Sequence, residues 1–390
     1  MKGKAVLRIR AILFLFGAVL LSGSTGLLSA LCGPFTDVSD AAFCPFVLEI
    51  FYLGITTGTT ATTYDPTGNV TRLQMAAFLS RTVDGALKRG GRRASLDQFW
   101  TTQNATVLGV TTVGNDPELL ASDGADVWVA CSGNSLVARV RSSDGRLLET
   151  WTGAISAHGV LSAMGRVIVT GYTSPGQLYQ IDPTQAAGAV TTVASNLGNR
   201  PDGIVFDGTR VWTANILGGS VSIVTPGPSL PWTVTTVTAG FTSPMGAVFD
   251  GANVWVTDYN AGKLFKLDGS GSILQTVTVD GLAANPVFDG SNIWVPCGGN
   301  SSVFVVRASS GAILATLIEN GLNDSIGAAF DGQRVLVTNL GGDSVSLWKA
   351  ADLTAIGTFA TGTGSAPVGA ASDGVNFWVA LSGTAKLARF

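Results

Sequence analysis

The sequence has few of the residues that catalytic and metal sites use. Its 390 residues include one histidine, His158, and four cysteines, and only 13% are charged. A single histidine excludes sites built from several imidazoles. The sequence also contains no C-x-x-C, H-E-x-x-H, Walker or G-x-S-x-G motif. A net charge of −3 gives no general attraction to nucleic acid, so we expect no nucleic-acid partner.

Glycine, in contrast, is abundant, with 50 residues, and 46% of the chain is hydrophobic. The glycines do not recur at every third position, which excludes collagen. Glycine together with many Val, Thr and Trp residues is typical of short strands joined by tight turns. The composition therefore favours an all-β fold.

Residues 1–30 have the pattern of a signal peptide. A basic start, MKGKAVLRIR, precedes the apolar run AILFLFGAVLL and then the small residues of SGSTGLLSA. The alternative is a membrane anchor over about residues 11–31, but the Gly/Ser-rich second half makes it a poor spanning helix. We expect an exported protein, at the cell surface, extracellular or periplasmic, that meets the membrane only through this segment.

Residues 31–83 predict a small helical module. Phe46, Val47, Ile50 and Leu53 recur at helical spacing, and Gly54 ends that helix. Thr71 caps a second helix. The apolar face of this second helix consists of Leu73, Ala76, Ala77, Leu79 and Val83. Cys32 and Cys44 lie in the same module, either as a disulfide or as two thiols.

This module resembles the S-layer homology (SLH) family. The matching elements are FTDV, LGITTG, YDPTGNVTR and QMAAFLSR. The resemblance implies binding to a cell-wall polymer or peptidoglycan, with the family's contact motif falling on residues 71–74. It assigns Arg72 and Thr71 as polymer contacts, although Gln74 replaces the family's usual acid. The alternative is that Thr71 is only a helix cap and Arg72 a solvated side chain.

Residues 84–103 form a basic, glycine-containing linker. We expect a solvated hinge. The alternative is a contact with anionic wall polymer or phospholipid head groups.

Residues 104–390 are built from a repeat of about 42 residues. An Asp-Gly marker gives the period, and a degenerate copy places Ala163 at the equivalent position. The marker aspartates are Asp123, Asp207, Asp250, Asp289, Asp331 and Asp373. Seven units of this length, each with several strands, predict a seven-bladed β-propeller.

Each unit has the same internal pattern. Asp-Gly supplies a tight turn, and an apolar run such as VWVA or VWVT follows as the second strand. A run without alternation is typical of a strand buried on both faces, so we expect its tryptophans to pack between blades. The last unit lacks an outer strand, and the sequence of residues 104–114 resembles the sequences of the outer strands. We therefore expect the N-terminal segment to complete the seventh blade.

The repeats resemble YVTN-type and NHL-like propellers and the propeller of streptogramin B lyase. That group includes lyases, lactonases, quinoproteins and binding modules, so the resemblance implies the fold and leaves the function open. The lyase mechanism relies on more than one histidine, which this chain lacks.

The residues before each inner strand predict a candidate site at the mouth of the central channel. The aligned column reads Glu118, His158, Asp202, Met245, Ala284, Ile326 and Val368. Two carboxylates and a histidine suit an acid–base pair or a metal, and a divalent cation is the one cofactor that they favour. The polar rim predicted around them consists of Asn199, Arg200, Asp202, Asn285 and Asp324. The alternative is that these residues only form turns.

We therefore expect a cell-wall-associated surface or envelope protein whose propeller binds a polymer, a protein or a small polar ligand. The first alternative is a lyase or hydrolase with a metal-assisted site at Glu118, His158 and Asp202. The second alternative is a structural role in an outer layer. Cys131 and Cys297 lie in non-adjacent blades, so we expect two buried thiols.

Overall fold

The computed structural model describes residues 32–40, 42–52, 56–79 and 109–390. The chain divides into two compact units, residues 1–98 and residues 99–390. The predicted signal peptide and linker lie outside the described residues. In the part of the chain that the structure describes, no helix has the length and apolarity needed to cross a membrane.

The N-terminal unit is held by a small apolar core and one disulfide. Helix α2 (Cys44–Tyr52) confirms the first predicted helix, and residues 72–79 form the second. Cys32 is bonded to Cys44, with Cα atoms 5.5 Å apart, which decides between the two alternatives for these cysteines. The core consists of Cys32, Phe35, Val38 and Val47, with Cys44, Leu48, Phe51 and Tyr64 packed against it.

The predicted apolar face of the second helix is not buried. Leu73 is 84% exposed and Leu79 is 59% exposed, while Ala77 is half-buried; on α2, Phe46 is 62% exposed. The reason is that Phe35, Phe51 and Tyr64 already close the core against one another. Ile50 is half-buried and Ala76 is exposed, while Leu53 and Val83 lie outside the described residues.

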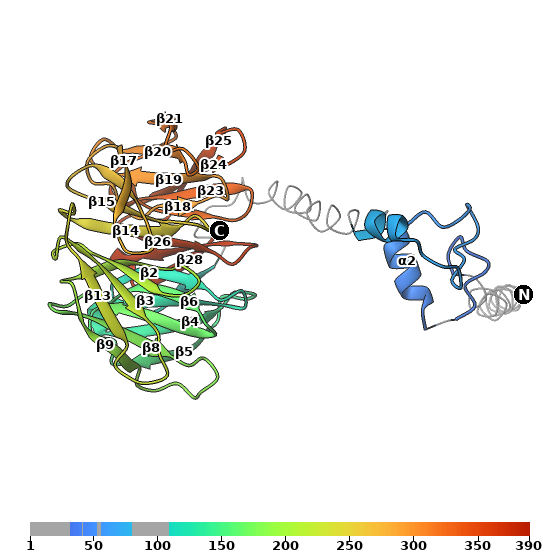
Figure 1. The fold of residues 1–390 in the computed structure, drawn as a ribbon, viewed down its shortest axis with the longest axis horizontal. Helices are drawn as coiled ribbons and strands as arrows, with labels where there is room; N and C mark the ends of the chain where they lie inside the picture. The colour runs from blue at the N-terminus through green and yellow to red at the C-terminus, as the bar shows by residue number, and fades with distance from the viewer. Residues whose placement is uncertain (1–31, 41, 53–55, 80–108) are drawn as a thin grey trace, which may run out of the picture. The chain divides into compact units, whose positions relative to one another are not determined.

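The second unit is the predicted seven-bladed propeller of four-stranded antiparallel sheets (Figure 1). Blade 1 is β2 (Pro117–Ser122), β3 (Asp126–Cys131), β4 (Leu136–Arg141) and β5 (Leu147–Thr152). Blade 2 is β6 (Ala157–Ala163), β7 (Arg166–Gly171), β8 (Gly176–Ile181) and β9 (Thr191–Leu197). Blade 3 is β10 (Pro201–Phe206), β11 (Val211–Asn215), β12 (Ser220–Thr225) and β13 (Thr233–Val237). Blade 4 is β14 (Pro244–Phe249), β15 (Val254–Asp258), β16 (Lys263–Leu267) and β17 (Ile273–Thr278).

The remaining blades follow the same order. Blade 5 is β18 (Val287–Phe288), β19 (Asn292–Cys297), β20 (Ser302–Arg307) and β21 (Ile313–Leu317). Blade 6 is β22 (Ser325–Phe330), β23 (Arg334–Asn339), β24 (Ser344–Lys349) and β25 (Ala355–Ala360). Blade 7 is β26 (Pro367–Ser372), β27 (Phe377–Leu381), β28 (Lys386–Arg389) and β1 (Val110–Thr112). Short 3-10 turns, η1 (Ser132–Asn134), η2 (Leu340–Gly342) and η3 (Ser382–Thr384), follow the second strands of blades 1, 6 and 7.

Strand β1 closes the ring as the sequence predicts. It pairs with β28, with Val110 opposite Ala388 and Thr112 opposite Lys386. The innermost strands β2, β6, β10, β14, β18, β22 and β26 contact one another in sequence around the ring. The N-terminal strand therefore covers the edge that blade 7 would otherwise leave open.

The Asp-Gly turn is fastened to the tryptophan of its own blade. In blade 3, Asp207 Oδ1 accepts the backbone N–H groups of Thr209 and Arg210, and Oδ2 accepts the indole N–H of Trp212 at 2.7 Å. The same indole bond forms at Trp128, Trp255, Trp294 and Trp378. All five rings are almost completely buried between strands, which confirms that they pack rather than stack on a ligand.

Glycines and threonines set how closely neighbouring inner strands approach. A Cβ on Gly159, Gly203, Gly246, Gly327 or Gly369 would lie 2.4–2.6 Å from an atom of the following blade. Blades 2, 4 and 6 add a threonine bridge. In blade 6, Thr338 Oγ1 accepts the Gly327 N–H and donates to the carbonyl of Val368 in blade 7. These contacts fix the backbone on which the candidate site is built.

Candidate functional site

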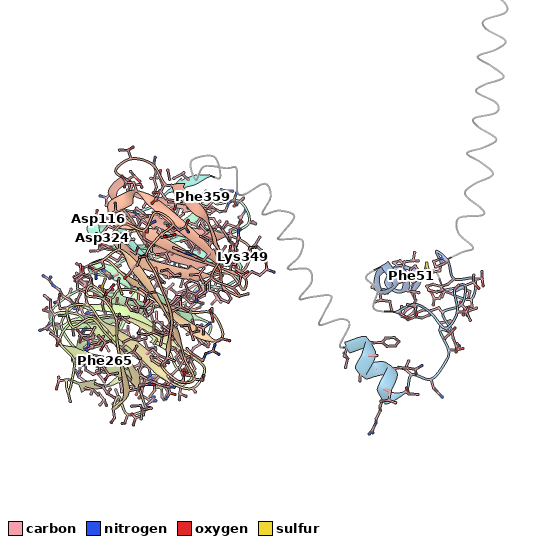
Figure 2. The ribbon with its side chains drawn as sticks, turned by 90° about the horizontal axis from the view of Figure 1, so that it is seen from above. Phe51, Asp116, Phe265, Asp324, Lys349 and Phe359 are labelled. Carbon is pink, nitrogen blue, oxygen red and sulfur yellow. A yellow bond between two sulfur atoms is a disulfide. The ribbon has the colours of Figure 1, made fainter. Side chains whose placement is uncertain are left out.

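The loop before each inner strand has the same backbone in nearly every blade. The residue that follows the second strand donates its N–H to a carbonyl in this loop, as Ser132 does to Asp116 and Tyr172 to Ser156. The accepting residue has a left-handed conformation at Asp116, Ser156, Arg200, Leu282, Asp324 and Ala366. We call the side of the propeller formed by these loops the rim face. In Figure 2, Asp116 and Asp324 lie on the side of the propeller opposite Lys349.

Three of the predicted residues meet on the rim face. His158 lies between the two carboxylates, with Nε2 3.8 Å from Glu118 Oε2 and Nδ1 3.7 Å from Asp202 Oδ1. Each of the three residues comes from a different blade, and each occupies the second position of its inner strand, β2, β6 or β10. The predicted sector of blades 1 to 3 is therefore a real cluster.

Asp202 is buried without a hydrogen bond to Oδ1. The residue is 2% exposed, and neither Asp202 Oδ1 nor His158 Nδ1 has a hydrogen-bond partner among the described residues. Burial raises the pKa of Asp202 to about 6, while His158 lowers that pKa and Glu118 raises it further. A carboxylate held in this way is costly for the fold, because its charge is desolvated and the nearby His158 offsets only part of that cost.

Two residues that sequence reasoning missed complete the cluster. Ser132 Oγ donates to Glu118 Oε1 at 3.0 Å, and the ring of Tyr172 stacks on His158 with centroids 4.7 Å apart. Both occupy the position directly after a second strand, which faces the loop of its own blade. That shared position is the signal in the repeat alignment that could have found them.

The other predicted rim residues are less closely associated. Arg200 is exposed, and its guanidinium lies 5.3 Å from the Tyr172 ring centroid. Asn199 is exposed, Asp324 is half-buried, and Asn285 has a buried Nδ2 without a described partner. The rest of the aligned column, Met245, Ala284, Ile326 and Val368, is apolar. The polar residues of this column therefore all lie in blades 1 to 3.

The cluster does not fit a single metal ion. The two imidazole nitrogens face different carboxylates, so one ion cannot contact Asp202, Glu118 and a nitrogen together. Among the described residues, no group of three or more His, Cys, Asp or Glu is arranged to hold a metal. The geometry instead suits hydrogen bonding and proton transfer.

The two cysteines of the propeller are inert in this arrangement. Cys131 and Cys297 are buried and unbonded, and burial raises the pKa of each thiol to about 12. Neither residue supplies a nucleophile at neutral pH.

In the N-terminal unit, Thr71 is the helix cap. Thr71 Oγ1 accepts the Gln74 N–H, and Gln74 Oε1 accepts the Thr71 N–H at 2.8 Å. Gln74 therefore closes a capping box in place of the acid that the family motif usually carries. Arg72, next to this cap, is exposed, and no ion pair joins it to another described residue.

Comparison with known families identifies the first unit. The model of the S-layer homology domain matches residues 34–76, within the predicted module. Such domains typically bind cell-wall polymers, so this chain carries a domain that associates with the cell surface. Among curated proteins, none is significantly similar to this sequence.

The propeller resembles solved structures of several functions. A streptogramin B lyase matches with 15% identity and a TM-score of 0.60, over 72% of this chain and 96% of that one. The virginiamycin B lyase of Staphylococcus aureus matches with 15% identity and 0.60, over 72% and 97%. The hydrazine synthase of Kuenenia stuttgartiensis matches with 14% identity and 0.60, over 72% and 97%. At these identities the similarity shows the fold alone.

Proposed function

We propose that the protein is exported, is held to the cell wall through its SLH domain, and binds a ligand on the rim face of its propeller. The observation that carries the proposal is the cluster of Glu118, His158 and Asp202, in which the buried atoms Asp202 Oδ1 and His158 Nδ1 have no hydrogen-bond partner among the described residues. Buried polar atoms in a fold are normally paired. A chain that retains a desolvated carboxylate without a hydrogen bond to Oδ1, beside a largely buried histidine, bears a stability cost that a ligand site explains.

The wall contact rests on Arg72. Thr71 and Gln74 satisfy one another in the capping box, so Thr71 supports the helix end and Arg72 carries the charge. The guanidinium is exposed and has donors suited to carboxylate or phosphate groups of a wall polymer. Arg72 is therefore the side chain whose loss should weaken wall retention most.

The wall contact is tested by retention of the full-length protein on purified cell-wall sacculi. Arg72→Ala should lose most of the retention, whereas Arg146→Ala, which removes an exposed arginine of the propeller, should retain as well as the wild type. Equal retention of both variants would contradict the role of Arg72.

A second candidate is an enzyme of lyase or hydrolase type. The observation in its favour is the position of His158, with Asp202 behind Nδ1 and the reactive side of the ring toward Glu118. A buried carboxylate that orients an imidazole is an arrangement that general bases use. Turnover of cell-wall fragments by the full-length protein, abolished by His158→Ala, would establish this candidate. Saturable binding of such fragments without turnover supports the binding module.

A further inference from the structure

A hollow of about 480 Å³ lies between blades 7 and 1, on the side of the propeller opposite the rim face. The inner strands begin at the rim face and end at the Asp-Gly turns, and the turns of blades 1 and 7 line the hollow. The loop between β4 and β5 and Arg389, at the end of β28, complete the lining. A hollow of this volume can hold a small molecule.

Arg389 supplies the positive charge of the hollow and has no carboxylate partner. Arg139, Arg210 and Lys266 each lie over the indole ring of a blade tryptophan and reach an aspartate within 3.9 Å. Lys266 occupies the same register position as Arg389, opposite the tryptophan of its blade. Arg389 also lies over its tryptophan, 5.7 Å from the Trp378 ring centroid, but no ion pair joins it to another described residue. Blade 7 therefore leaves this cation without the counter-charge that the other three have.

The loop of blade 1 holds one edge of the Arg389 guanidinium. Nη1 donates to the carbonyl oxygens of Ser142 at 3.4 Å and Ser143 at 3.2 Å. Nε and Nη2 donate to no described atom, and neither is among the buried atoms that lack a partner, so both reach solvent. The guanidinium is thus fixed along one edge, while the edge with two parallel donors is free.

The lining also supplies a free acceptor and a free hydroxyl. Asn376 uses Nδ2 to donate to Asp373 Oδ2 at 2.9 Å, and Asn376 Oδ1 has no described partner. Ser143 is exposed, and its hydroxyl has no described partner either. These two groups can hydrogen-bond the hydroxyls of a ligand that occupies the hollow beside Arg389.

Asp373 limits the negative charge that the hollow can accept. Its Oδ1 accepts the N–H groups of Val375 and Asn376, and its Oδ2 accepts Asn376 Nδ2 and the indole N–H of Trp378. Burial raises the pKa of Asp373, but these hydrogen bonds outweigh burial and lower the pKa overall, so the group is charged at neutral pH. Its charge opposes a dianion more strongly than a monoanion.

We propose that this hollow binds an organic carboxylate that carries hydroxyl groups, of the size of a single sugar acid. The carboxylate accepts parallel hydrogen bonds from Nε and Nη2 of Arg389, and a hydroxyl of the ligand donates to Asn376 Oδ1. A neutral sugar lacks the group that the guanidinium selects, and a tetrahedral dianion meets the charge of Asp373. The site is separate from the rim face and goes beyond the binding function proposed for that face.

The experiment follows Arg389 directly in full-length protein labelled with 15N-arginine. The Nε–Hε signals are recorded by NMR at pH 6.5 and constant ionic strength during titration with sodium glucuronate, glucose or sodium sulfate. Arg389→Lys identifies the Arg389 signal by its loss. We expect glucuronate to shift this signal saturably, sulfate to bind at least about threefold more weakly, and glucose to cause no saturable shift. The signal of Arg210, which is paired with Asp207, should not move.

An exchange of arginine for lysine tests the role of the guanidinium. Arg389→Lys keeps the charge but removes the two parallel donors, and should weaken glucuronate binding about tenfold. Binding is measured on the ligand by saturation-transfer NMR. Arg146→Lys makes the same exchange at an exposed position of the loop between β4 and β5, and should leave the affinity within about twofold.

A second pair of variants leaves Arg389 in place. Val375 is 58% exposed in the Asp-Gly turn of blade 7, where blade 4 has the exposed Ala252, so the turn tolerates different side chains. Val375→Glu adds a negative charge at the hollow and should weaken glucuronate binding at least about threefold. Ala252→Glu adds the same charge in the equivalent turn, away from the hollow, and should leave the affinity within about twofold.

The outcomes are distinct from those for the rim face. Glucuronate that leaves the Arg389 signal unmoved would overturn the proposal, and so would an equal shift with glucose. Sulfate that binds more tightly than glucuronate would overturn the assignment to a carboxylate. None of these results bears on Glu118, His158 and Asp202, because they lie at the opposite end of the inner strands.

Discussion

Blades 1 to 3 and blades 4 to 7 have the same loop backbone on the rim face but carry different side chains at the aligned position of the inner strand. In both groups the residue after the second strand donates to the loop carbonyl, and glycines allow neighbouring inner strands to approach closely. Blades 1 to 3 then place Glu118, His158 and Asp202 at the position where blades 4 to 7 place Met245, Ala284, Ile326 and Val368.

The comparison shows that polarity at this position is not needed for folding. Four blades close the ring with apolar side chains, which need no partner and cost no desolvation. The polar side chains of blades 1 to 3 include a buried carboxylate, Asp202, whose Oδ1 has no hydrogen-bond partner among the described residues. We infer that this sector of the ring is specialised for binding and that the backbone beneath it is shared.

The shared backbone should be equally sensitive in both groups. Gly203→Ala would place its Cβ 2.6 Å from the Met245 carbonyl oxygen, and Gly327→Ala would place it 2.4 Å from that of Val368. Each should lower the free energy of unfolding by about 3 kcal/mol. Urea unfolding measures the loss, with Gly281→Ala as the control because a Cβ there meets no atom within 4 Å. A large effect in only one group would show that the two groups do not share the framework.

Removing a threonine bridge should lower the free energy of unfolding less than the glycine substitutions do, and by a similar amount in both groups of blades. Thr170 accepts the Gly159 N–H in blade 2, and Thr338 accepts the Gly327 N–H in blade 6. Thr170→Val and Thr338→Val leave these N–H groups unpaired and should each cost about 1–2 kcal/mol in urea unfolding. Thr235→Val, at an exposed strand position, is the matched control. If either substitution leaves the free energy of unfolding unchanged, that threonine does not contribute to the shared backbone framework.

Replacing polar residues of the cluster by the residues that the apolar blades carry should have the smallest effect on the free energy of unfolding. Glu118→Met and His158→Ile introduce side chains that blades 4 and 6 use at the same position. Each should change the free energy of unfolding by less than about 1 kcal/mol. Thermal unfolding checks this, and a loss of several kcal/mol would mean that the cluster serves the fold.

The repeat made the propeller predictable. Its period of about 42 residues gives the number of blades, and aligning the repeats identifies the residue of each inner strand that lies at the mouth of the central channel. The closing strand β1 and the burial of the five tryptophans followed from the same alignment. The alignment could also have indicated the bond from aspartate to indole, since the Asp-Gly turn lies five residues before each of these tryptophans and blade 2 lacks both.

Other features depend on three-dimensional packing. The repeat alignment does not show that Tyr172 stacks on His158 or that Asp202 Oδ1 is left without a donor, because both depend on how neighbouring blades approach. The predicted apolar face of the second helix of the SLH domain, and Phe46 on the first, were wrong for a related reason, whereas Val47 lies in the core as predicted. Periodicity identified the helices, but Phe35, Phe51 and Tyr64 fill the small core and leave Leu73 and Phe46 outside.

The most direct test of the central claim is the pH dependence of stability in the wild type and in Asp202→Asn. The pKa of Asp202 is raised from 3.8 to about 6, so the folded state binds its proton more tightly than the unfolded state. Asp202 therefore lowers stability progressively as the pH rises from about 4 to about 6, by about 3 kcal/mol in total. Asp202→Asn should lack this decline and should be more stable than the wild type at pH 7.5. A less stable variant at pH 7.5 would contradict the account, because Asp202 would then be a residue that the fold requires.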